Sequence, residues 1–120
     1  MSIRDLSTAD FESTVAENSI VLVDFWASWC GPCRAFAPVF DRSSQSHPDV
    51  VHAKVDTEAQ QQLASALQIQ SIPTIMAFRD GMLVYRQPGA MPAPALEDLI
   101  TQVKELDMTE VRANIAAATS

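Results

Sequence analysis

The spacing of apolar positions predicts three strand-forming segments in this chain. Residues 19–27, SIVLVDFWA, form a near-continuous apolar run rich in β-branched residues, which is typical of a strand covered on both faces. Residues 50–56, VVHAKVD, show the same enrichment. Residues 74–87 contain two apolar runs separated by the turn sequence Asp80–Gly81, and they therefore predict an antiparallel hairpin.

Helical spacing marks the segment that follows Cys30. Its apolar residues recur at i, i+3, i+4 and i+7, which places on one helix face Cys33, Phe36, Ala37 and Phe40. Pro38 lies inside this segment and should kink the helix, because proline lacks the backbone N–H and crowds the preceding turn.

Three further segments have helical character. Residues 5–18 predict a short helix capped by Ser7 or Thr8. Residues 57–69 predict a second helix. Residues 93–106 predict a final amphipathic helix, whose apolar face consists of Leu96, Leu99, Ile100 and Val103.

The order of these elements indicates an α/β fold. Helix–strand–helix–strand–helix followed by strand–strand–helix predicts a three-layer α/β/α sandwich, in which helices flank a mixed central sheet on both faces. The segment SIRDL at the start is too weak to decide whether it adds an edge strand. We expect one domain over residues 1–107 and an extension over residues 108–120. Asp107 and Glu110 have the spacing of a capping box, so the extension either forms a short helix or frays.

Composition and charge disfavour several classes of function for this chain. The 120 residues carry a formal net charge of -7, which disfavours binding to nucleic acid or to an anionic membrane surface. Residues 1–13 lack the pattern of a secretory signal, and no apolar run approaches the roughly 20 residues that span a bilayer. We therefore expect a monomer in the reducing cytoplasm, where a C-x-x-C pair is catalytic or metal-binding more often than structural.

The two cysteines of the chain, Cys30 and Cys33, lie in the sequence WCGPC. Such a pair can be a structural disulfide, half of a metal site or a redox couple. A structural bridge across so short a loop would add little stability. The metal alternative is a zinc site. The cysteines together with His47 and His52 have the spacing C-x2-C-x13-H-x4-H, which fits a zinc-finger pattern. Pro48 and the strand pattern around His52 argue against it, since they exclude a helix that presents both histidines.

A redox couple fits the position of the pair. Cys30 follows a buried strand and opens a helix, whose free N–H groups and partial positive charge favour a thiolate. We predict that Gly31 leaves Cys30 uncovered and open to a partner disulfide, and that Pro32 stiffens the loop. Cys33 then lies in the first helical turn, close enough to resolve the mixed disulfide.

Asp24 interrupts the apolar run, where a carboxylate is costly unless it is neutral or partnered. One interpretation is a strand-end side chain that reaches solvent. The other is a buried proton acceptor for Cys33, with a pKa that burial raises. Lys54 is the candidate charge partner, although a strand lysine taken alone is more often simply solvated.

Pro73, in the sequence SIPT, is a turn residue, an edge marker or a cis proline on sequence grounds alone. Together the segments VDFWASWCGPC, SIPT and RQPGA resemble the thioredoxin family, at consistent spacings over about residues 2–107. The resemblance implies a thioredoxin-like fold and a cis peptide bond before Pro73.

The resemblance also implies a role for each matching residue. Cys30 would attack a target disulfide, and Cys33 would release the reduced target. Asp24 would exchange a proton with Cys33 through water, tuned by Lys54, and Trp26 would pack beside the site. The implied docking patch for an extended partner segment consists of Trp29, Gly31, Pro32, Ile72, Pro73, Gly89 and Ala90.

The implied activity is that of a protein-disulfide reductase, an electron carrier that uses its own dithiol and no other cofactor. Its implied partners are disulfide-containing target proteins and an NADPH-dependent flavoprotein, thioredoxin reductase. Two rivals stay open. An oxidase or isomerase usually has a histidine between the cysteines, where this chain has Gly31–Pro32. A non-catalytic binding module could use the same fold and patch.

Overall fold

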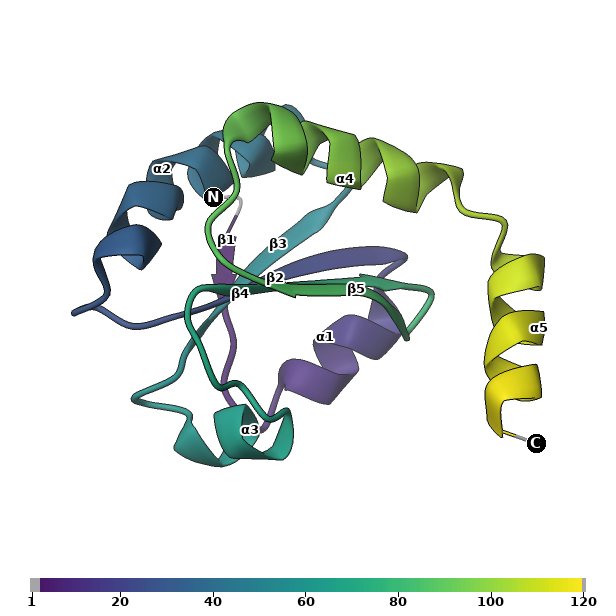
Figure 1. The fold of residues 1–120 in the computed structure, drawn as a ribbon, viewed down its shortest axis with the longest axis horizontal. Coiled ribbons are helices and arrows are strands. Elements are labelled where there is room, and N and C mark those ends of the chain that lie inside the picture. The colour runs from purple at the N-terminus through teal and green to yellow at the C-terminus, as the bar shows by residue number, and fades with distance from the viewer. Residues whose placement is uncertain (1–2, 120) are drawn as a thin grey trace.

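A computed structural model describes residues 3–119, with side chains placed to residue 117 (Figure 1). Its five strands are β1 (Ile3–Asp5), β2 (Ile20–Trp26), β3 (Val51–Asp56), β4 (Thr74–Arg79) and β5 (Met82–Pro88). They form one sheet in the order β1-β3-β2-β4-β5. Strands β1, β3 and β2 run parallel to one another, and β4 runs antiparallel to both β2 and β5. The predicted mixed sheet is confirmed, and the undecided first residues form its edge strand β1.

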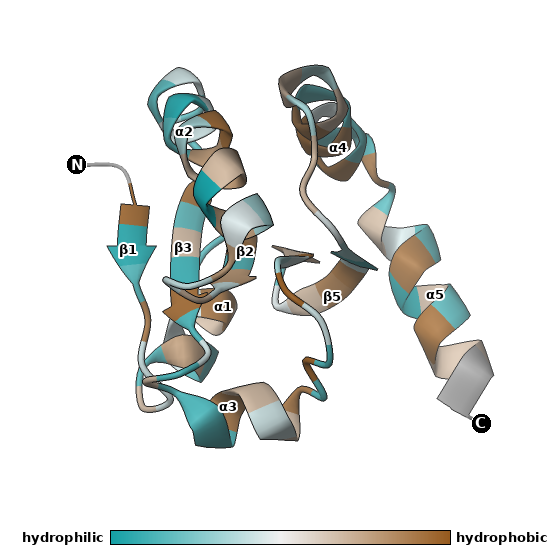
Figure 2. Ribbon diagram, turned by 60° about the vertical axis from the view of Figure 1, so that its left-hand side comes forward, coloured by the Kyte–Doolittle hydropathy of each residue, from teal (hydrophilic) through white to brown (hydrophobic). Residues whose placement is uncertain are grey.

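The helices are α1 (Phe11–Glu17), α2 (Gly31–Ser46), α3 (Gln61–Ala66), α4 (Ala93–Glu105) and α5 (Met108–Thr119). Helices α2 and α4 cover one face of the sheet, and α1 and α3 lie on the other, as Figures 1 and 2 show. The predicted three-layer sandwich is therefore confirmed. Within residues 3–119, no helix has both the length and the apolar character needed to cross a membrane.

Strand β2 contributes to two hydrophobic cores, one on each face of the sheet. Val21, Val23 and Phe25 pack toward α1, whereas Ile20 and Leu22 pack toward α2 and α4. Successive side chains of a strand point to opposite faces, so a strand covered on both sides needs apolar residues at every position. This arrangement explains the near-continuous apolar run of β2.

The start of α1 differs from the prediction. The helix begins after Asp10, and neither Ser7 nor Thr8 caps it. Instead, the Ser7 N–H donates to the Asp10 carboxylate at 2.6 Å, and the Thr8 N–H donates to the Gln60 side chain at 2.9 Å. The predicted capping residues are thus used to hold the connection between β1 and α1.

Helix α3 is shorter than the predicted helix over residues 57–69. Its N-terminal part is replaced by a turn, in which the Thr57 N–H donates to the Trp26 carbonyl oxygen at 2.9 Å. The Asp56 carboxylate accepts the next two backbone N–H groups. At the other end, Gln68 adopts a left-handed φ of 55°, which a helix cannot continue through.

The extension after α4 forms a helix rather than a frayed tail. The Asp107 carboxylate accepts hydrogen bonds from two backbone N–H groups of the first turn of α5. Met108 is buried, and the Arg112 guanidinium lies 3.4 Å from the Asp80 carboxylate at the tip of the β4–β5 hairpin. Residues 1–2 and 120, which the expected ranges include, lie outside the described residues.

Candidate active site

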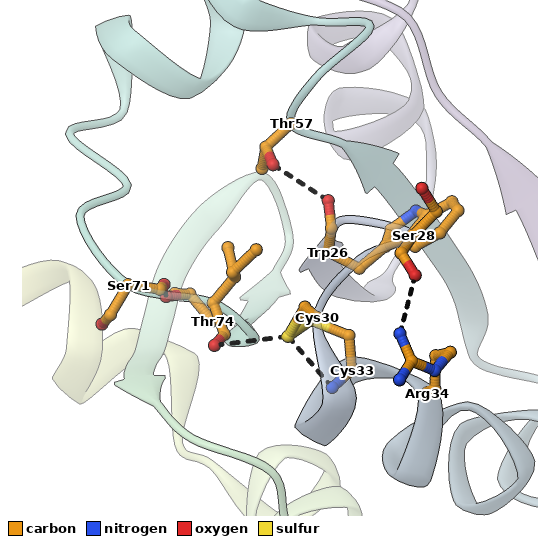
Figure 3. The surroundings of a disulfide bond; sticks show 9 residues. Trp26, Ser28, Cys30, Cys33, Arg34, Thr57, Ser71 and Thr74 are labelled. Carbon is orange, nitrogen blue, oxygen red and sulfur yellow. Dashed lines mark hydrogen bonds between the residues drawn. A yellow bond between two sulfur atoms is a disulfide. The ribbon is translucent and has the colours of Figure 1, made fainter.

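The two cysteines form a disulfide at the N-terminus of α2 (Figure 3). Cys30 is the N-cap of the helix, and its Sγ accepts a hydrogen bond from the Cys33 N–H at 3.2 Å. The two Cα atoms are 5.2 Å apart, because the residues occupy the cap and the first turn of one helix. The same N–H and the partial positive charge of the helix end would stabilise a thiolate on Cys30.

Cys30 is less accessible than predicted. Only 4% of its surface is exposed, against 2% for Cys33, so the prediction that Gly31 leaves Cys30 uncovered was wrong for this oxidised pair. Gly31 does not supply this cover, since a side chain there would meet, among the described residues, only the Arg34 guanidinium, at 4.0 Å. The cover comes from Ile72, 42 residues later in the chain, whose carbonyl oxygen lies 3.7 Å from the Cys30 Sγ.

The segment that covers the disulfide contains the Ile72–Pro73 cis peptide bond, which confirms that prediction. The Thr74 hydroxyl donates to the Ser71 carbonyl at 2.6 Å and closes the turn around the proline. The Gly89 N–H donates to the Pro73 carbonyl at 2.7 Å, and Gly89 has a φ of 104°, where a side chain would be strained. These contacts bring Ile72, Pro73 and Gly89 together beside the disulfide.

The exposure of that patch varies from residue to residue. Trp29 is 65% exposed, which agrees with the expected surface position. The other solvent-exposed members are Gly31, Pro32, Gly89 and Ala90. Ile72 is half-buried and Pro73 is buried. Among the described residues, no hydrogen bond uses the Ile72 N–H, so this group is free to pair with an extended segment.

Asp24 is completely buried on β2, and neither carboxylate oxygen has a hydrogen-bond partner among the described residues. The interpretation of a strand-end side chain that reaches solvent was therefore wrong. Burial raises the pKa of Asp24 to about 6, and the charge of Lys54 opposes that rise. A carboxyl with this pKa can both take up and release a proton near neutral pH.

Lys54 is the register partner of Asp24 on β3, but no ion pair joins the two side chains in the described part of the chain. Its Nζ lies 4.6 Å from the centroid of the Trp26 ring instead. Trp26 packs against the disulfide, as expected, and its carbonyl accepts two hydrogen bonds from Thr57 (Figure 3). The charge of Lys54 therefore lowers the pKa of Asp24 although the two described side chains form no ion pair.

The structure does not support the zinc alternative, because both histidines have other partners. His52 is buried with its ring nitrogens 2.9 Å from the Ser43 hydroxyl and 3.1 Å from the Val50 carbonyl oxygen. His47 lies 2.6 Å from the Glu97 carboxylate on α4. Within the described residues, no group of three or more metal-binding side chains occurs.

Arg34 belongs to the site and was missed from sequence. Its guanidinium donates to the Ser28 carbonyl at 3.0 Å and so ties the first turn of α2 to the loop that carries Trp29 (Figure 3). A signal was present, because a cation in the first turn of a helix opposes the helix dipole and therefore calls for a specific reason.

Comparison with known proteins agrees with this geometry. The family model described as Thioredoxin matches residues 2–111. A protein named "Putative thioredoxin 2" from Streptomyces coelicolor is 51% identical over 115 residues, covering 96% of this chain and 86% of the relative. "Thioredoxin 1" from Synechococcus elongatus is 46% identical over 97 residues, covering 79% and 91%.

A solved structure shows the same likeness. A point mutant of a thioredoxin from Halobacterium salinarum superimposes with a TM-score of 0.81 at 34% identity, and the match covers 88% of this chain and 93% of that one. The fold, the disulfide at the start of α2, the cis proline beside it and these similarities lead to one conclusion: this chain belongs to the thioredoxin family and is a protein disulfide oxidoreductase.

Proposed function

We propose that this protein works in the cytoplasm as a dithiol reductant of disulfide-containing target proteins, and that a thioredoxin reductase fed by NADPH restores its dithiol. The observation that carries the proposal is the Cys30–Cys33 disulfide at the N-terminus of α2, covered by the Ile72–Pro73 segment. The catalytic unit corresponds to residues 1–107, with the extension 108–120 outside it.

The reaction needs four sulfur atoms and no further cofactor. In the reduced protein, the Cys30 thiolate attacks one sulfur of the target disulfide, and the other target sulfur leaves as a thiolate that takes up a proton. The Cys33 sulfur, after losing its proton, then attacks Cys30. This second step forms the Cys30–Cys33 disulfide and releases the second target thiol, so two electrons and two protons have moved to the target.

Asp24 is the proposed proton acceptor for Cys33. Its buried position, its unpaired oxygens and its raised pKa support a carboxylate that takes the Cys33 proton through water in the release step. Lys54 keeps that pKa from rising further, because its charge favours the ionised form of Asp24.

The docking patch is the proposed contact surface for both target and reductase. Trp29, Gly31, Pro32 and Gly89 offer a surface with few charges, and the free N–H of Ile72 lies in reach of an extended backbone. Hydrogen bonding to the main chain does not depend on the side chains of the partner, which suits a reductant with several targets.

The reduction potential of the Cys30–Cys33 pair tests this function. After equilibration with dithiol buffers, free thiols are trapped by alkylation and counted by mass. We expect a value near about -270 mV, typical of a cytosolic reductant. A value between about -180 and -120 mV would identify a disulfide isomerase or donor instead.

Activity in a coupled assay completes the test. The protein should pass electrons from NADPH and a bacterial thioredoxin reductase to a disulfide-bonded protein substrate, and the variant Cys30→Ser should not. If the variant with both cysteines changed to serine kept the biological role of the protein, a non-catalytic binding module would be the correct description.

A further inference from the structure

A cleft of about 440 Å³ opens beside the active site, between the exposed Trp29 and helix α3. The loop after β3 forms one wall, and the segment that leads into the cis proline forms another. In Figure 3 these two segments are marked by Thr57, above the disulfide, and by Ser71, to its left, whereas Arg34 lies to its right. The residues of the cleft used below are Trp29, Glu58, Gln61, Ser65, Gln70 and Ile72.

The cleft adjoins the sulfur atom that exchanges with the target. Ile72 lines it, and the carbonyl oxygen of the same residue lies 3.7 Å from the Cys30 Sγ. A partner segment joined to Cys30 and running along Ile72 therefore carries its neighbouring side chains past the mouth of the cleft. The side-chain chemistry of the cleft can thus select among targets.

Glu58 supplies the only charge among the described residues that line the cleft. Its side chain is exposed, and no Lys, Arg or His of the described part of the chain forms an ion pair with it. Its backbone is held in place, because the Glu58 N–H donates to the Asp56 carboxylate at 2.9 Å. The carboxylate is therefore displayed from a fixed loop with no cation of its own.

The rest of the lining suits a positively charged side chain with an apolar stem. Trp29 offers an indole ring that is 65% exposed, and cations bind over the faces of such rings. The chain already contains this pairing, since the Lys54 Nζ lies 4.6 Å from the Trp26 ring centroid. Gln61, Ser65 and Gln70 add side-chain oxygens that accept hydrogen bonds from an ammonium or guanidinium group.

We propose that this cleft is a subsite for a lysine or arginine side chain next to the attacked cysteine of the target, with Glu58 as its specificity-determining residue. The proposal rests on the proposed reductase function and adds a target preference to it. Opposite charge across a solvated interface also speeds association, so the preference should appear in kcat/KM and weaken with salt.

Competition among short disulfide-bonded peptides tests the subsite. The probes are cyclic peptides that carry arginine, norleucine or glutamate on either side of the attacked cysteine, where norleucine matches the apolar stem without a charge. We expect kcat/KM to fall in the order arginine, norleucine, glutamate, with about a three- to fivefold step between arginine and norleucine at low salt. Glu58→Gln should remove that step, and Glu58→Lys should reverse the order of arginine and glutamate.

A matched control keeps the net charge of the variant but leaves the cleft intact. Glu105→Gln removes an exposed carboxylate from α4, on the opposite side of the sheet from α3, and should retain the arginine preference (Figure 1). Equal rates for all three peptides, a norleucine preference, or an unchanged preference in Glu58→Gln would overturn the subsite while leaving the reductase function standing. Failure to reduce any of the peptides would instead count against the proposed function itself.

Discussion

Asp24 and His52 are both completely buried on the same face of the sheet, but only His52 has hydrogen-bond partners among the described residues. Leu22 of β2 pairs in register with His52 of β3, and Asp24 follows Leu22 by two residues, so the two polar side chains are close neighbours. Both side chains are shielded from solvent, so the difference between them lies in whether their polar atoms have hydrogen-bond partners.

The hydrogen bonds of His52 assign its tautomer. The Val50 carbonyl can only accept, so the His52 Nδ1 donates to it, and the Nε2 accepts from the Ser43 hydroxyl of α2. Burial lowers the pKa of His52, because the apolar surroundings disfavour the charged ring. Every polar atom of this neutral ring is paired, so His52 acts as a structural link between β3 and α2.

Asp24 is the opposite case. Its buried oxygens lack partners among the described residues, and an unpaired buried carboxyl costs stability that a neutral apolar residue would not. Such a cost is expected to persist only where the group does chemistry. The comparison teaches that burial alone does not identify a functional side chain, and that the missing hydrogen-bond partners are what distinguish Asp24 from His52.

The largest effect is expected from His52→Ala. The change removes two buried hydrogen bonds and leaves a cavity among Phe40 and its neighbours, so we expect a loss of about 3 to 5 kcal/mol in the free energy of unfolding at pH 8. Urea denaturation followed by tryptophan fluorescence measures it. A loss below about 1 kcal/mol would mean that His52 is not a structural link.

Asp24→Asn should act in the opposite direction. The folded-state pKa of Asp24, about 6, lies above its ordinary value of 3.8, so its favourable contribution is complete below pH 3.8 and is lost as pH rises through 6. The variant should therefore be more stable than the native protein by up to about 3 kcal/mol at pH 8 and about equal at pH 4. Urea denaturation at the two pH values measures the difference.

The same variant should slow the release step. Without the carboxylate, Cys33 loses its proton acceptor, and we expect single-turnover release of a target to slow at least about tenfold. A stabilised variant with an unchanged release rate would contradict the catalytic role of Asp24 and leave only its structural cost.

Ser43→Ala tests the His52 link with a smaller change. The Nε2 of His52 would lose its donor, and we expect a loss of about 1 kcal/mol at pH 8. Below pH 6.5 the native protein loses stability, because the unfolded state takes up a proton on His52 that the folded state, with its lowered pKa, does not take up. Stability curves of both proteins from pH 8 to pH 5 would show whether the difference shrinks once the ring is charged.

The smallest effect is expected from Lys54→Met. Removal of the charge that favours the ionised form should raise the pKa of Asp24 further, and so move the pH dependence of target release to higher pH. The carboxyl band of Asp24 in difference infrared spectra gives the pKa directly. A shift to lower pH would show that Lys54 does not act on Asp24 through its charge.

Much of the architecture was predictable from local patterns. The strands, the hairpin turn and the apolar faces of α2 and α4 depend on residues two to four positions apart, which the sequence displays directly. The hairpin shows why: Asp80 and Gly81 both have positive φ, a conformation that this pair of residues favours. The site residues came from motifs and a family resemblance rather than from periodicity.

The errors arose where distant segments compete for the same local groups. Thr8 was expected to cap α1, but its N–H and its hydroxyl both bond to the side chain of Gln60, 52 residues later. Thr57 was expected inside a helix, but its N–H and hydroxyl both bond to Trp26, 31 residues earlier. Sequence patterns do not show such long-range partners.

By itself, the sequence determined the order of the elements, the reactive cysteine pair at a helix start and the presence of one carboxylate in an apolar strand. Only the tertiary structure decided that Ile72 covers Cys30, that His52 is fully paired and that Asp24 has no partner among the described residues. The physical reason is that secondary structure follows from neighbours along the chain. Burial and hydrogen-bond partners instead depend on which side chains the packed fold brings together.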